Sequence, residues 1–163
     1  MREIKLEKVV LICGATGPNL EKSQKLLELI SGKKAHIIKA GSKRRIPDFG
    51  VKPFLPLGTR VTLRGKDAFE ILKPLLGAID NRLNEKQISD NSFSFGIKEY
   101  IEIPGIEYQR EIGIRGLNVT AAFIRRGIRV KRKKIKVGRV PERQYIKPEE
   151  IIKFMEENFK TEI

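Results

Sequence analysis

The sequence of 163 residues contains no tryptophan, one cysteine and one histidine. A lone cysteine cannot form an internal disulfide, so Cys13 is expected to be a buried apolar side chain in a reducing, intracellular protein. A single histidine without a cysteine cluster offers no zinc ligand set, and we expect neither a metal nor another cofactor. Apolar runs stay well below the roughly 18 residues that a membrane span needs. The sequence therefore predicts a cytoplasmic protein without a membrane partner.

Positive charge is concentrated in two segments. Residues 33–52, the first basic segment, carry seven Lys/Arg and one acid, for a net charge of +6. Residues 125–143, the second basic segment, carry ten Lys/Arg and one acid, for +9. The whole chain has a net charge of +14, so the other 124 residues together are close to neutral. Charge focused in this way attracts a polyanion, and nucleic acid is the commonest one inside cells. The alternative to a nucleic-acid-binding surface is that both basic segments are simply loops exposed to solvent.

The composition of the second basic segment favours RNA over DNA or a membrane surface. Its arginines can bind phosphate through two parallel hydrogen bonds and stack on bases. It lacks the tryptophan or phenylalanine and the clean apolar face of an interfacial helix. The chain carries no helix-turn-helix, zinc-finger or basic-zipper pattern. The candidate RNA contacts in this segment are Arg125, Arg126, Arg129, Lys131, Arg132, Lys133 and Lys134.

Hydrophobic periodicity divides the first half of the chain into strands and helices. Strands are predicted at residues 4–13, 35–38 and 59–64. Helices are predicted at residues 20–30 and 65–79. Asn19 is expected to cap the first helix, and Pro74 to kink the second or break it into two. Prolines and glycines within residues 39–56 predict a long basic loop.

The second half adds two strands and a helix, and completes a single domain over residues 1–163. Alternation predicts a strand over 93–103 that turns at Pro104-Gly105, and another over 117–124. A basic extension over 124–143 then leads to a C-terminal helix over 147–160, with Pro148 in its first turn. We predict an α+β fold in which helices pack on one face of an antiparallel sheet. The other face stays open, and there Arg60, Thr62 and Arg64 suit an RNA backbone.

The turn over Gly14–Gly17 is the one stretch that resembles an enzyme motif. A strand, two glycines and a helix could bring a phosphate to a helix N-terminus. A P-loop, however, continues with Gly-Lys-Ser/Thr, whereas Gly17 is followed by Pro18-Asn19. Acids gather at Glu99, Glu102, Glu107 and Glu111, but nothing places two of them at a catalytic separation. A protein without enzymatic activity is predicted, and a nucleotide-dependent enzyme using Gly14–Gly17 remains the alternative.

Several motifs in order resemble one family. They are Leu29-Ile30-Ser31-Gly32-Lys33-Lys34-Ala35, Ile46-Pro47-Asp48-Phe49-Gly50, Leu57-Gly58-Thr59-Arg60-Val61-Thr62-Leu63-Arg64-Gly65, Asp80-Asn81-Arg82-Leu83, Phe93-Ser94-Phe95-Gly96-Ile97-Lys98-Glu99 and Ile103-Pro104-Gly105-Ile106-Glu107-Tyr108. Their order and spacing resemble the large-subunit ribosomal proteins that carry 5S rRNA, the ribosomal protein "L five" family. The second basic segment and the final helix are similar to its archaeal and eukaryotic-type members.

This resemblance implies a structural protein that binds 5S rRNA and 23S rRNA in the central protuberance, beside other large-subunit proteins. It also implies contact with a small-subunit head protein. The RNA contacts that it implies are Lys33, Lys39, Lys43, Arg44, Arg60, Thr62 and Arg64. The long loop would reach P-site tRNA through Arg45, Ile46, Pro47, Asp48, Phe49, Gly50 and Lys52. A general RNA chaperone is a further alternative.

The chain departs from the family at the first turn. Archaeal members usually read Asn-Ile-Gly-Val-Gly there, whereas this chain has Ile12-Cys13-Gly14 followed by Ala15-Thr16-Gly17. Thr16 and Asn19 are therefore the candidates to replace the RNA contact of that asparagine.

Overall fold

The computed structural model describes residues 3–162 and contains one antiparallel sheet and four α-helices in that range. The strands are β1 (Ile4–Gly14), β2 (His36–Lys39), β3 (Pro56–Arg64), β4 (Ile88–Ser89), β5 (Ser92–Ile97) and β6 (Leu117–Arg125). The helices are α1 (Asn19–Ser31), α2 (Lys66–Gly77), α3 (Arg129–Arg132) and α4 (Pro148–Phe159). Short 3-10 turns are η1 (Pro47–Phe49), η2 (Glu85–Gln87), η3 (Tyr100–Glu102) and η4 (Glu142–Gln144). The strand order β2-β3-β1-β6-β5-β4 confirms the predicted α+β fold.

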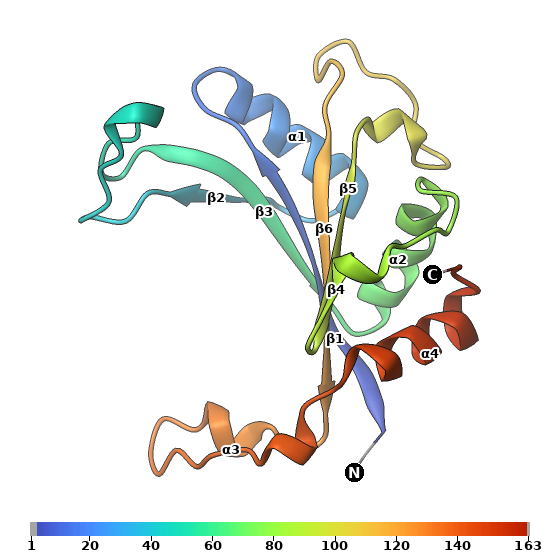
Figure 1. Cartoon of the computed structure of the whole chain (residues 1–163). Helices are drawn as coiled ribbons and strands as arrows, with labels where there is room; N and C mark the ends of the chain where they lie inside the picture. The colour runs from blue at the N-terminus through green and yellow to red at the C-terminus, as the bar shows by residue number, and fades with distance from the viewer. Residues whose placement is uncertain (1–2, 163) are drawn as a thin grey trace.

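Helices α1, α2 and α4 all lie on one face of the sheet (Figure 1). Successive side chains of a strand point to opposite faces, so alternate residues of β1, β3, β5 and β6 are buried beneath the helices. The Phe123 ring lies near the centre of this core, 5.8 Å from the Phe93 ring and 5.4 Å from that of Phe154 in α4. In the described residues, α1, α2 and α4 therefore leave most of the second face of the sheet open, as the sequence predicts.

The start of α1 differs from the prediction. Helix α1 begins at Asn19 itself, after Pro18, and no side chain caps its N-terminus. The Asn19 Oδ1 atom instead accepts a hydrogen bond of 2.6 Å from the guanidinium of Arg115, which reaches it from the loop before β6. The helix ends as expected at Gly32, whose φ of 62° lies in the left-handed region that glycine adopts without strain. The predicted capping role of Asn19 is therefore wrong.

Of the kink or break predicted at Pro74, the break into two helices is wrong. Helix α2 is continuous from Lys66 to Gly77, with Pro74 in its last turn. A proline removes one intrahelical hydrogen bond. Here the neighbouring Leu72, Leu75 and Leu76 side chains are fully buried, and this packing holds the helix together.

The predicted strand over 93–103 is too long. Strand β5 ends at Ile97, and the chain turns into η3, where the Tyr100 side chain is fully buried. The Tyr100 hydroxyl accepts a 2.8 Å hydrogen bond from the backbone amide of Gln109, which fixes the loop that follows. Ile101 is consequently 40% exposed rather than part of the core. The short hairpin between β4 and β5 is a further element that the sequence patterns do not predict.

Candidate nucleic-acid interface

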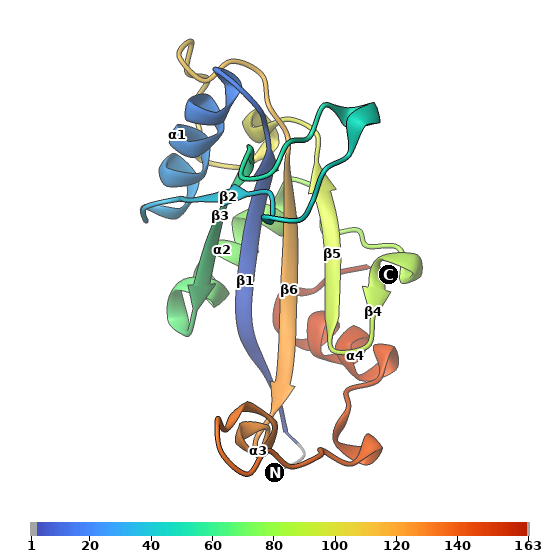
Figure 2. The same ribbon diagram turned by 90° about the vertical axis from the view of Figure 1, so that its left-hand side faces the viewer.

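The open face of the sheet is largely polar across four strands. Strand pairing aligns Arg60, Thr62 and Arg64 of β3 with Ile12, Val10 and Lys8 of β1. The same rows continue on β6 and β5 through Asn118, Thr120, Ala122, Gly96, Ser94 and Ser92. Figure 2 looks onto this face. The three predicted β3 residues are exposed here, so the expectation that they point away from the helices is confirmed.

Two basic arms project from the sheet on the side of this open face (Figures 1 and 2). The hairpin arm, residues 40–55, connects β2 to β3 at one end of the sheet. The α3 arm, residues 126–141, follows β6 at the other end. The hairpin arm carries four of the seven Lys/Arg of the first basic segment, and the α3 arm carries eight of the ten of the second. The open face therefore lies between two cationic projections, an arrangement that concentrates positive potential over a polar platform.

The hairpin arm has a defined tip. Backbone hydrogen bonds of 3.0 Å in both directions join Ile46 to Val51 and close η1 between them. Residues 41–50 are all exposed, and the Phe49 side chain is 82% exposed. Lys43, Arg44 and Arg45 line a shallow hollow at the base of this tip. The predicted tRNA-contacting residues are thus gathered at one protruding end.

The α3 arm is folded rather than an extended tail. Its loop is closed by a 3.1 Å hydrogen bond from the Gly138 amide to the Val130 carbonyl. The Lys131 ammonium lies 5.8 Å from the centre of the Tyr145 ring, a favourable cation–π distance. Lys133 and Lys134 of this arm are exposed.

Glu7 ties this arm to the sheet. It occupies a β-bulge of β1 between Leu6 and Lys8, and its side chain is only 8% exposed. Its carboxylate accepts hydrogen bonds from Arg64 at 3.2 Å and from Arg132 of the α3 arm. Burial alone would raise the pKa of Glu7, but these two guanidinium groups outweigh it and hold the pKa below its ordinary value.

Replacing Glu7 by Gln is expected to lower the free energy of unfolding by about 1 kcal/mol near neutral pH, because the two arginines are more than half exposed and well hydrated. Because the pKa of Glu7 is lower in the folded protein, its ionised carboxylate stabilises the fold at pH values above its unfolded-state pKa. This stabilisation is lost as the pH falls through the folded-state pKa. The difference between the two proteins in urea unfolding should therefore shrink below about pH 4. The exposed Glu107→Gln is the matched control, and an equal effect of both variants would contradict the role of Glu7.

The Arg125 side chain is buried and hydrogen-bonded to other parts of the protein. It lies at the end of β6 on the helix-covered face and is 8% exposed. Its Nη2 atom donates to Glu150 of α4 at 2.6 Å, and Nη1 donates to the Arg143 carbonyl at 3.2 Å. Burial raises the pKa of Glu150, but the hydrogen bonds from Arg125 and the Lys147 amide, together with the charges of both residues, outweigh it and lower the pKa. These contacts occupy the guanidinium, so Arg125 would have to exchange its present partners to reach RNA, and its RNA contact stays a prediction.

Other predicted RNA contacts also have protein partners. Lys33 pairs with Asp67 of α2, and Arg64 and Arg132 share Glu7. Asn19 is engaged by Arg115 at the start of α1. The turn over Gly14–Gly17 joins β1 to α1, with Gly17 in the left-handed region at φ 61°.

Sequence reasoning missed the polar half of the open face on β5 and β6. Ser94, Asn118, Thr120 and the Gln87 side chain line a shallow depression there. The alternation of Asn118 and Thr120 with buried Val119 and Ala121 was the available signal.

Between residues 3 and 162, no group of three His, Cys, Asp or Glu side chains is placed to hold a metal ion. In the same range, every helix is too short or too polar to cross a membrane.

Fold and charge distribution together define a basic α+β protein built around an open polar sheet face. Residues 56–153 match the family model for the C-terminus of the ribosomal protein "L five" family. A protein of Nanoarchaeum equitans named large ribosomal subunit protein uL5 is 40% identical over 166 residues, which cover all of this chain and 97% of that protein. Proteins of the same name from Sulfurisphaera tokodaii and Methanoregula boonei are 38% and 32% identical, again over all of this chain and over 93% and 99% of theirs. The chain belongs to this ribosomal protein family, and the resemblance drawn from its motifs is confirmed.

Proposed function

We propose that this protein is a structural, non-enzymatic constituent of the large ribosomal subunit that binds 5S rRNA and attaches it to 23S rRNA in the central protuberance. As a member of a ribosomal protein family, it acts in translation on the cytoplasmic ribosome. One observation carries the proposal: a polar, open sheet face lies between two cationic arms in a chain of this family. Folded RNA is recognised through its backbone, and such a surface offers arginine, lysine and hydroxyl donors to phosphate and ribose.

The two arms suit two different RNA segments. In this proposal the open face and the base of the hairpin arm hold 5S rRNA, and the α3 arm follows neighbouring 23S rRNA. The proposed contacts with exposed side chains are Lys39, Lys43, Arg44, Arg60, Thr62, Arg126, Arg129, Lys131, Lys133 and Lys134. Asn19, Lys33, Arg64 and Arg132 would have to share or exchange their present partners to reach RNA.

The tip of the hairpin arm is the proposed contact with P-site tRNA. It carries Arg45, Lys52 and the exposed Phe49 ring, so it can combine phosphate binding with stacking. An acidic surface on the loop over 98–116 includes exposed Glu99, Glu102 and Glu107. Its charge suits a basic small-subunit head protein better than RNA.

A competition gel shift tests the central proposal. The full-length protein is bound to labelled 5S rRNA and challenged with unlabelled 5S rRNA or an unrelated RNA of equal length, at the same salt concentration. We expect 5S rRNA to compete at much lower concentrations. Equal competition by both RNAs would support a general RNA chaperone instead, and heat on titration with ATP or NAD would support an enzyme.

Replacing Arg60 by Ala is expected to weaken 5S rRNA binding by about 1–3 kcal/mol, the range for loss of a charge-assisted hydrogen bond. Arg60 is exposed on the β3 side of the open face, and its removal leaves the core of β3 untouched. Arg110→Ala removes the same charge from the exposed loop over 98–116 and is the control. If both variants bind as the unmodified protein does, the open face is not the 5S rRNA site.

A further inference from the structure

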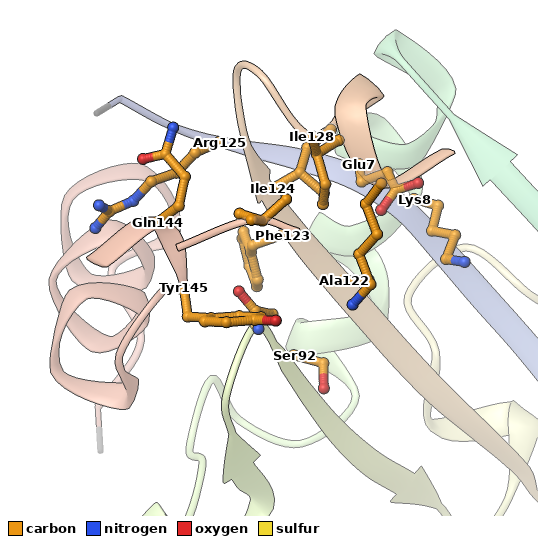
Figure 3. Close-up of a pocket in the computed structure, with 13 residues that line it drawn as sticks. Glu7, Lys8, Ser92, Ala122, Phe123, Ile124, Arg125, Ile128, Gln144 and Tyr145 are labelled. Carbon is orange, nitrogen blue, oxygen red and sulfur yellow. The ribbon is translucent and has the colours of Figure 1, made fainter. Parts of the chain in front are cut away.

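A cavity of about 270 Å³ lies where the α3 arm meets the end of the open face (Figure 3). Its apolar wall includes Ala122 and Ile124 of β6, Ile128 and Val140 of the α3 arm, and Tyr145. Lys8 of β1 and Lys131 of the α3 arm also line it. The cavity is therefore partly apolar but opens on a surface that carries positive charge.

Tyr145 gives the cavity an aromatic wall. The side chain is 41% exposed, and Figure 3 shows its ring among the residues that line the cavity. The Lys131 ammonium lies over this ring, 5.8 Å from its centre. An exposed aromatic ring next to a cation is the arrangement by which proteins stack a nucleobase and bind its phosphate.

Two amides in the cavity wall are held in place by hydrogen bonds to the backbone. Asn91 Oδ1 accepts a 3.0 Å hydrogen bond from the Ile146 amide, which leaves its NH₂ group as a donor. Gln144 donates to the Arg126 carbonyl at 3.3 Å, which leaves its Oε1 atom as an acceptor. A base edge presents both donors and acceptors, so a fixed donor and a fixed acceptor can recognise it.

We propose that this cavity binds one unstacked nucleobase of the RNA held by the open face and the α3 arm. The inference rests on the proposed function, and adds to it a site for a single base. The volume is below the range of about 300–1,000 Å³ for drug-sized ligands, so it suits one ring system rather than a whole nucleotide. The sugar and phosphates would stay outside, beside Lys8 and Lys131. The positive surroundings disfavour a basic protein segment as the occupant.

Photo-crosslinking provides the direct test. The full-length protein is irradiated with ultraviolet light in its 5S rRNA complex and in assembled large subunits, and all crosslinked peptides are mapped by mass spectrometry. We expect a nucleotide adduct on Tyr145 and none on Tyr108, which is 53% exposed on the loop over 98–116. Adducts elsewhere on the open face, with none on Tyr145 in either sample, would overturn the base site while leaving RNA binding intact.

A second measurement separates a base from its phosphates. A uridine octamer and an abasic strand of equal length carry the same charge, so only the bases distinguish them. The unmodified protein should prefer the uridine strand, and Tyr145→Ala should reduce this preference about fivefold or more. Tyr145→Phe and the control Tyr108→Ala should retain it, with the same salt dependence in all variants because no charge changes. An unchanged preference in Tyr145→Ala would overturn the proposal, whereas absence of 5S rRNA binding by the unmodified protein would overturn the proposed function itself.

Discussion

A variant with alanine at Lys39, Lys43 and Arg44 is expected to bind 5S rRNA roughly 100-fold more weakly at 0.1 M salt, with a log–log salt slope shallower by about 2 to 3. The three side chains are exposed at and beside the base of the hairpin arm, where each can neutralise one phosphate. Every phosphate contact releases condensed counterions, so the loss grows as the salt concentration falls. Filter binding at several potassium concentrations measures both quantities.

A change in net charge alone has to be separated from loss of these contacts. Alanine at Lys22, Lys66 and Lys153 removes the same charge from exposed positions on α1, α2 and α4, which cover the other face. This control should shift affinity only slightly and leave the salt slope nearly unchanged. Equal losses in both triple variants would mean that the protein attracts RNA by its overall charge and not through the hairpin arm.

Replacing Glu150 by Gln should lower the free energy of unfolding by about 3 kcal/mol, and the unfolding midpoint by about 6–12 °C. The variant leaves the buried Arg125 guanidinium without its carboxylate, and removing one partner of a buried pair costs about 3–5 kcal/mol. We use the lower end of this energy range because the Glu150 side chain is 41% exposed. Its hydrogen bond from the Lys147 amide at the start of α4 is also weakened.

The neighbouring Glu149 provides the control, since it is exposed in the same helical turn. Glu149→Gln should change stability by a few tenths of a kcal/mol, the usual effect at a surface position. Because the pKa of Glu150 is lowered, the stabilisation is present above its ordinary value of 4.5 and is lost as the pH falls through the folded-state value. Similar unfolding midpoints for the two variants at pH 7 would show that the Arg125 pair contributes little.

Local patterns in the sequence predict most of the sheet and the helices. Period-two alternation identifies β3 and β6 because one face of each is buried, and Gly32 marks the end of α1. The same pattern misleads after Ile97, because Tyr100 turns into the core through a 3-10 turn that alternation does not reveal. Pro74 misleads for the opposite reason: a local rule predicts a break, and tertiary packing of the helix overrides it.

The charges of the interface are visible in the sequence, but their partners are not. Arg125 belongs to a run of basic residues, and only the pairing of β6 with β1 and the position of α4 place it beside Glu150. Glu7 looks like one of several surface acids until the β-bulge turns it toward Arg64 and Arg132. That both basic segments reach the same side of the sheet follows from strand order and twist, which are set by contacts far apart in the chain.

The central position of β1 has a consequence for how the protein is made. Val9 of β1 pairs with Leu63 on one side but with Ala121 on the other, so its second edge has no strand to join until most of the polypeptide has been synthesised. An unpaired strand edge is a template for aggregation, and pairing across a long stretch of chain is slow. The β1 edge of a nascent chain therefore stays open to aggregation until the last strand, β6, has emerged from the exit tunnel.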